Sequence, residues 1–175
     1  MLKETKKIKD IRFASIIYHA FVEYYINELI CLKFTKAKLI IDNIVTGSFF
    51  NKYQILKALE IFKKLENKDK LEKNIEVLTS IRNYYAHNLV TSAELPDKIK
   101  NHIEQLTIFN IINYKTMDSI PIKKSRKGYE LKFSLCAIST IVFLHKIVMA
   151  NKDLKEFADF NNSKTYQKIQ KLTSL

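Results

Sequence analysis

An arginine, a side-chain amide and a histidine lie close together in residues 81–88, which read Ile-Arg-Asn-Tyr-Tyr-Ala-His-Asn. Arg82 carries a permanent charge and can hold a phosphate through two parallel hydrogen bonds. His87 can take up and release a proton near neutral pH. Together these groups could bind a phosphodiester, take a proton from a ribose 2′-hydroxyl and deliver one to the leaving oxygen. The predicted chemistry is RNA cleavage to a 2′,3′-cyclic phosphate, with neither a metal ion nor another cofactor.

The spacing of these residues has a geometric meaning if the segment is helical. At about 100° per residue, Asn83 and His87 stand at i and i+4 on one face, where the amide can bond the imidazole and fix its tautomer. Arg82 lies one position away, and its long stem can bring the guanidinium round. A purely structural alternative stays open, in which Arg82 pairs with an acid on a neighbouring helix and His87 caps its own helix.

Glu23 is the acid that could serve this group, because it follows His19 by four residues on the first predicted helix. If the bundle packs that face near Arg82, the carboxylate could position the guanidinium. The alternative is an ordinary surface pair, which is worth only about 0.3–0.5 kcal/mol.

Three neighbours of the motif have candidate roles as well. Tyr84 and Tyr85 could stack on RNA bases, although helix geometry requires one of them in the core, and we assign Tyr85 to it. Asn88 either binds phosphate or ends the helix.

The order Arg82, Asn83, three further residues and then His87 resembles the R-x4-H signature of the HEPN superfamily of all-helical domains. The preceding Gly47-Ser48-Phe49-Phe50 and the helix-like stretch after it are similar to mannitol-operon-repressor-like and other short prokaryotic branches, over about residues 10–160. The resemblance implies a helical bundle that forms a homodimer, with two motif helices meeting in a composite ribonuclease site. It also implies a toxin–antitoxin or phage-defence setting, with an antitoxin or regulatory protein as a partner.

A dimer also follows from the chemistry, because one arginine and one histidine are few groups for both the acid and the base role. In members controlled by a nucleotidyltransferase antitoxin, a tyrosine stands two places after the histidine, where this chain has Leu89. A second hypothesis is a non-catalytic regulator or adaptor, in which the motif face binds a protein, a nucleotide or a nucleic acid.

The formal charge of +12 is consistent with RNA as a partner, because basic side chains near phosphates release counterions. Only Arg12, Arg82 and Arg126 are arginines. The basic part of residues 110–130 is a candidate RNA-binding tip, and it contains Lys123, Lys124, Arg126 and Lys127. Solvated lysine-rich faces, as codon bias in an AT-rich genome would produce, are the alternative.

Composition predicts an all-α protein with a single domain over residues 1–175. The 175 residues are 47% hydrophobic and include two glycines and two prolines, which leaves little turn chemistry for a many-stranded sheet. Cys31 and Cys136 form no CxxC pair, as expected of reduced thiols in a cytosolic protein. No unbroken apolar run reaches the ~18 residues of a membrane span. We therefore expect a cytoplasmic protein without a membrane partner.

Apolar periodicity predicts the elements that must position the motif. Helical stretches are predicted at residues 6–33, 36–45, 51–65, 70–88, 96–109 and 131–151, followed by a short one at 152–160 and a lysine-rich one from 164 onward. With the resemblance, we expect them to form a HEPN-like bundle of about five to seven helices. Gly47 is predicted to end one helix in the left-handed conformation, with Ser48 or Asn51 capping the next. Within residues 107–130 we expect a short β-hairpin or a long loop.

Overall fold

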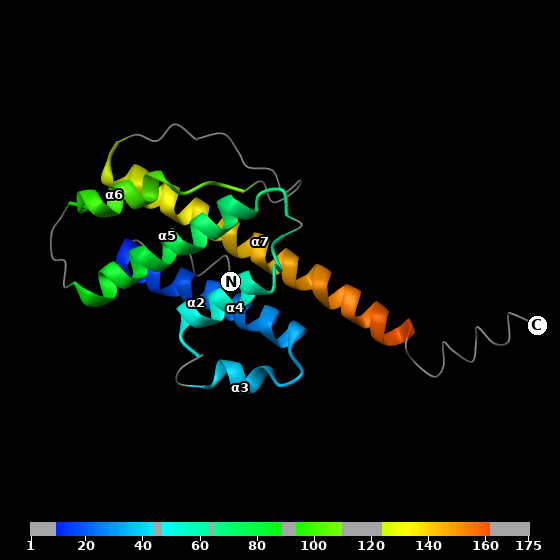
Figure 1. The fold of residues 1–175 in the computed structure, drawn as a ribbon. Helices are drawn as coiled ribbons and strands as arrows, with labels where there is room; N and C mark the ends of the chain where they lie inside the picture. The colour runs from blue at the N-terminus through cyan, green and yellow to red at the C-terminus, as the bar shows by residue number, and fades with distance from the viewer. Residues whose placement is uncertain (1–9, 44–46, 64, 89–93, 110–123, 162–175) are drawn as a thin grey trace, which may run out of the picture.

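The computed structural model describes residues 10–43, 47–63, 65–88, 94–109 and 124–161, and these ranges contain six helices and no strand (Figure 1). The prediction of an all-α bundle is confirmed. The helices are α2 (Ile11–Lys33), α3 (Ala37–Ile41), α4 (Phe49–Ala58), α5 (Lys68–His87), α6 (Asp97–Glu104) and α7 (Arg126–Asn161).

Helices α2, α5 and α7 form the centre of the bundle, and α4 and α6 pack against it. Helices α2 and α7 run in the same direction, because Asp10 and Arg126 share a hollow at one end and Lys152 reaches Glu28 at 2.8 Å near the other. Helix α5 runs the opposite way, so that its last turns lie beside the beginning of α2. The motif therefore sits at the end of the bundle where α2 and α7 begin.

The apolar spacing of α5 predicts a buried stripe of Leu71, Ile75, Leu78, Ile81 and Tyr85, and the helix buries all of it except Tyr85, which is half-buried. Leu71, Ile75, Leu78 and Ile81 are each at most 1% exposed. These side chains meet apolar residues of α2 and α7 in one hydrophobic cluster, including Val22, Ile26, Phe133 and Leu144. Packing of this stripe fixes the rotation of α5 about its axis, and hence the directions in which the motif side chains leave the helix.

The two helices before α5 are shorter than predicted. Helix α3 ends at Ile41, and residues 44–46 lie outside the described ranges. Helix α4 begins after Ser48, whose hydroxyl accepts from the N–H of Asn51 at 3.3 Å. It ends at Ala58 instead of residue 65, because Glu60 adopts a left-handed φ of 51° that a continuing helix does not allow.

Gly47 does not act as the left-handed cap that was predicted, because its φ is not positive. Glycine is required here for another reason: a Cβ atom would overlap the backbone carbonyl oxygens of Ile41 and Asn43. The N–H of Gly47 donates to the Asn43 oxygen at 2.6 Å, which closes the turn before α4. The prediction was wrong about the conformation of Gly47.

The last helix is one continuous element, so the predicted break between residues 151 and 152 is wrong. No glycine or proline lies there, and the last turns of α7 extend past the other helices (Figure 1). Among the described helices only α7 is long and apolar enough to cross a membrane by length and composition, with a mean hydropathy of 1.9 over 18 residues. Core helices of soluble proteins meet the same criterion, and 56% of this window is buried.

The segment around α6 departs from prediction in length. Helix α6 ends at Glu104, not near Phe109, and residues 107–109 continue without helix. The expected hairpin or loop lies mainly in residues 110–123, outside the described ranges, as does the expected helix from residue 164 onward.

Candidate functional site

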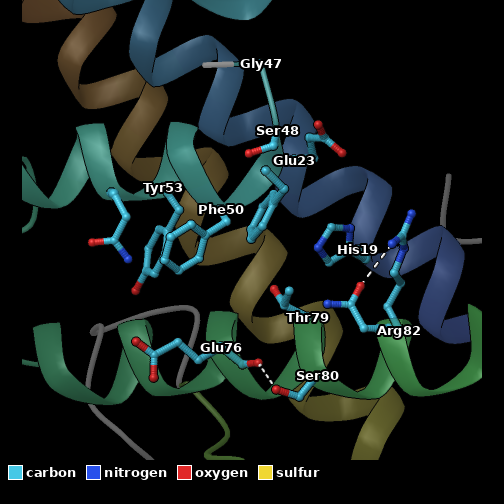
Figure 2. A pocket seen from close by; sticks show the side chains of 13 residues that line it. His19, Glu23, Gly47, Ser48, Phe50, Tyr53, Glu76, Thr79, Ser80 and Arg82 are labelled. Carbon is cyan, nitrogen blue, oxygen red and sulfur yellow. Dashed lines mark hydrogen bonds between the residues drawn. The ribbon is translucent and has the colours of Figure 1, made fainter. Parts of the chain in front are cut away.

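Helices α2, α4 and α5 surround a cavity of about 520 Å³ beside the motif (Figure 2). Arg82 and Asn83 line it from α5, and His19 and Glu23 line it from α2. The structure therefore brings together three of the predicted site residues, Arg82, Asn83 and Glu23. The third wall is the start of α4, at Ser48, Phe49 and Phe50.

Arg82 is half-buried at this cavity, and its guanidinium is held by its neighbour in the chain. Nη1 of Arg82 donates to Oδ1 of Asn83 at 2.9 Å. The amide was expected to orient the His87 imidazole, but its oxygen is used by the arginine instead. Asn83 is thus positioned to orient the guanidinium of Arg82.

His87 is the last residue of α5, and its side chain is exposed. It does not line the cavity. Five positions of helix separate it from Arg82, which corresponds to about 140° around the axis. Within one chain, the two groups therefore leave α5 on different sides.

Asn88 ends α5, which is the second of the two roles predicted for it. Its Nδ2 donates to the backbone oxygen of Tyr84 at 2.7 Å, which satisfies one of the last carbonyl groups of α5. The backbone of Asn88 is extended, with φ −127° and ψ 117°. His87 is therefore carried at a defined helix end.

His19 is a functional candidate that the sequence placed only as a companion of Glu23. The residue is 5% exposed, and its ring packs on Phe49 with 4.4 Å between the centroids. No hydrogen-bond partner for its Nε2 exists among the described residues. Burial and then the positive charge of Arg82 lower the His19 pKa from 6.5 to about 4, against an opposing effect of Glu23. The imidazole is consequently neutral at neutral pH, and Figure 2 shows it beside Arg82.

Glu23 pairs with a residue that was anticipated neither by the predicted contact with Arg82 nor by the alternative of an ordinary surface pair. Its Oε1 accepts from Nζ of Lys52 at 2.9 Å, and Lys52 is only 4% exposed. The carboxylate therefore neutralises a buried lysine of α4 and joins α2 to α4 at the cavity edge. It makes no ion pair with Arg82 in this structure.

Tyr84 and Tyr85 are both half-buried, so the expected division into one stacking and one core residue is not seen. Their rings meet edge to face with 5.4 Å between centroids, and the Lys98 ammonium lies 5.9 Å from the centre of Tyr84. Burial raises the pKa of Tyr85 to about 12. Tyr85 also lines a small hollow with Arg12 and Arg126.

All three arginines of the chain consequently lie at one end of the bundle. Arg12 and His19 are seven residues apart, about 10 Å along α2, so the small hollow is a short distance from the cavity. Hydrogen bonding by Arg12 lowers the pKa of Asp10, and Arg126 bonds Glu130 at 2.9 Å.

The predicted RNA-binding tip lies only partly within the described residues. Lys124, Arg126 and Lys127 are exposed at the start of α7, at the end of the bundle that carries the motif. Lys123 lies outside the described ranges. These positive side chains extend the basic character of the motif end over a second helix.

The remaining histidines lie away from this group. The apolar residues around His145 in the sequence predict a core position for it, but it is exposed and contacts Tyr25 with 5.6 Å between ring centroids. His102 is half-buried on α6, and burial lowers its pKa. In the part of the chain that the structure describes, no three His, Cys, Asp or Glu side chains gather as a metal site.

Comparison of the chain with protein-family models, with curated proteins and with solved structures finds no match. A functional assignment must therefore be argued from the residues and from the geometry of the site.

Proposed function

We propose that this protein is a metal-independent endoribonuclease of the HEPN type, which cleaves RNA to 2′,3′-cyclic phosphate ends. The observation that carries the proposal is the setting of the two motif groups. Arg82 is oriented by Asn83 at a cavity wall, and His87 is exposed at the adjacent end of α5. One group is thus suited to holding a phosphate, and the other is accessible for exchanging protons with it.

The roles of the residues follow from their chemistry. The Arg82 guanidinium binds the non-bridging oxygens of the scissile phosphate and offsets the charge that develops in the transition state. His87 removes the proton of the 2′-hydroxyl or protonates the leaving 5′-oxygen. Asn83 keeps the guanidinium in one orientation, so that less conformational freedom is lost when the phosphate binds.

A second copy of the chain completes the site. Arg82 and His87 of one chain leave α5 about 140° apart, so two antiparallel motif helices would present an arginine and a histidine to the same phosphate more readily than one. An exposed apolar stripe on α2, formed by Phe13, Ile16 and Tyr24, offers a surface that a second copy would cover. The active species is therefore a homodimer.

The biological setting belongs to the same proposal. The basic residues at the start of α7 contact the RNA backbone, and the enzyme acts in the cytoplasm as a toxin or phage-defence effector. An antitoxin or regulatory protein would restrain it by covering the motif end.

The direct test is incubation of the purified protein with single-stranded RNA in excess EDTA, with analysis of the fragment ends. We expect 2′,3′-cyclic phosphate termini, and Arg82→Ala or His87→Ala lowers the cleavage rate at least 100-fold, the size of a lost general acid–base group. His145→Ala is the matched control, because it removes an exposed histidine far from the motif and leaves the rate unchanged. Light scattering should show a dimer for all three variants. Cleavage that survives both motif substitutions overturns the assignment.

A non-catalytic regulator or adaptor is the second candidate, and one observation favours it. The cavity contains Arg82 but not His87, and a binding protein would need only the former. Intact RNA after incubation with the wild-type dimer, together with saturable ligand binding that Arg82→Ala abolishes, would select this function.

A further inference from the structure

Helix α7 carries an apolar stripe that stays exposed in the described structure. Its members are separated by three, four or seven residues, which places them within about 60° around the helix axis. Leu131 is 60% exposed, Leu135 37% and Met149 43%, and Ile138 and Val142 between them are half-buried. At 1.5 Å per residue the stripe is about 27 Å long. Single exposed apolar side chains need no explanation, but a continuous row of them marks a contact surface.

The stripe faces away from α5 and borders α2. Thr140, which accepts from Asn74 of α5 at 2.8 Å, lies nine residues after Leu131 and therefore about 180° from it around the axis. His145, at the edge of the stripe, contacts Tyr25 of α2. The α2 stripe that was assigned above to a second copy is thus a separate surface on the neighbouring helix, and the stripe on α7 belongs to neither that surface nor the cavity.

The stripe is uncharged along most of its length and has positive side chains at its start. Residues 133–145 contain no Asp, Glu, Lys or Arg. Lys124 and Lys127 are exposed just before Leu131, and helical spacing places Lys127 about 40° from that leucine. Asp153 is exposed at the far end, so the two ends of the stripe differ in charge. A surface that complements this face is apolar along the stripe and negatively charged at the start of α7.

A lipid bilayer with anionic headgroups combines these two properties. A second copy of this chain does not, because its formal charge is also +12 and like charges across an interface disfavour association. Helix α7 is apolar on its exposed side as well as on its buried side, with a mean hydropathy of 1.9 over an 18-residue window that is 56% buried. Because that buried part packs in the bundle, the helix can lie on a bilayer surface in the folded protein without crossing the bilayer.

We infer that this face of α7 binds the surface of an anionic membrane. The apolar stripe lies at the boundary between headgroups and acyl chains, and Lys124 and Lys127 lie beside the lipid phosphates. The inference does not depend on the proposed nuclease function, although the same two lysines contact RNA in that proposal. The sequence-based expectation of no membrane partner concerned unbroken apolar runs, which do not reveal one exposed face of a half-buried helix.

The chain contains no tryptophan, so one introduced tryptophan reports on its own surroundings. In the full-length Leu131→Trp variant, we expect the emission maximum to move to shorter wavelength when vesicles are added in which about a third of the lipid is phosphatidylglycerol and the rest phosphatidylcholine. Vesicles of phosphatidylcholine alone should cause a smaller shift. Leu154→Trp is the control, because Leu154 is 68% exposed on the same helix but lies about 140° from Leu131 around the axis, and its emission should not move.

Sedimentation with the anionic vesicles measures the partition coefficient of the protein. Leu131→Gln and Leu135→Gln should each lower it about tenfold, since each removes an apolar side chain from the lipid contact. Lys124→Gln and Lys127→Gln together should also lower it about tenfold. Leu154→Gln leaves it unchanged, and circular dichroism checks that all variants keep the helix content of the wild type.

Two results overturn the inference. One is an emission shift of Leu131→Trp that grows with protein concentration in the absence of vesicles, which would assign the stripe to a second copy. The other is no emission shift with anionic vesicles, or sedimentation that the stripe substitutions leave unchanged. Neither result depends on whether the wild-type protein cleaves RNA, so the membrane inference and the nuclease proposal can fail separately.

Discussion

Two buried polar side chains in and beside α5 differ in their hydrogen bonding. Asn74, in the N-terminal half of α5, has its hydrogen-bonding groups paired. His19 of α2, which lies beside the C-terminal half of α5, has an Nε2 without a partner among the described residues. Both residues face helices of the same bundle, and both are at most 5% exposed. The difference separates two regions of the bundle along α5. In the N-terminal half of α5 the buried polar groups of Asn74 hold the fold together, and beside its C-terminal half a buried polar atom of α2 is left without a partner among the described residues.

The side chain of Asn74 forms a closed hydrogen-bond network at the N-terminal half of α5. Asn74 is 0% exposed and donates to the backbone oxygen of Thr107 at 2.7 Å and to Oγ1 of Thr140 at 2.8 Å. Its own oxygen accepts from the N–H of Thr107 at 2.9 Å. One side chain thereby joins α5 to α7 and to the segment that follows α6.

The strongest test of this comparison is Asn74→Ala. We expect the free energy of unfolding to fall by about 3–5 kcal/mol, because a cavity forms and both backbone groups of Thr107 lose their partner. Urea unfolding followed by circular dichroism measures it. Asn101→Ala, at an exposed position of α6, should change stability by no more than about 0.5 kcal/mol. A loss below about 1 kcal/mol for Asn74→Ala would mean that the network does not hold this half together.

Much of this half was predictable from sequence, because an apolar stripe at helical spacing dictates which face of α5 is buried. The ends of the elements were less predictable. Glu60 adopts a left-handed conformation that a glutamate does not predict, and α4 ends before it. Helix α7 continues through residue 151, because no breaker residue lies there to end it.

The candidate site was predictable only where spacing along one helix decides which residues lie together. Arg82 and Asn83 were found from the motif, and the i to i+4 relation of His19 and Glu23 pointed to the correct face of α2. The pairing of Glu23 with Lys52 was not predictable, since it joins residues 29 positions apart through the packing of α4 on α2. The unpartnered His19 nitrogen likewise depends on how three helices meet.

The burial of neutral His19 should be visible in the pH dependence of the free energy of unfolding. The folded His19 pKa of about 4 lies below its ordinary value of 6.5, so the unfolded chain binds more protons between these pH values. Stability is therefore lost as the pH falls from about 6.5 to about 4, by about 3 kcal/mol from this group. Urea unfolding of the wild type and of His19→Leu across this range isolates the contribution, because carboxylates affect both proteins alike. Parallel curves would show that His19 is not buried in its neutral form.

The smallest expected effect concerns the cap that shapes the cavity. Ser48→Ala removes the acceptor for the N–H of Asn51 and should lower stability by about 1 kcal/mol, whereas Ser48→Asp retains a cap. Ser80→Ala is the control, at an exposed position of α5 that also lines the cavity. Its hydroxyl donates to the Glu76 carbonyl at 2.9 Å, a bond that adds little to a helix, so we expect a change within about 0.5 kcal/mol. Urea midpoints of the three variants decide the matter. If Ser48→Ala costs as much as Asn74→Ala, the start of α4 is part of the structural core, and the contrast between the two halves of α5 would no longer hold.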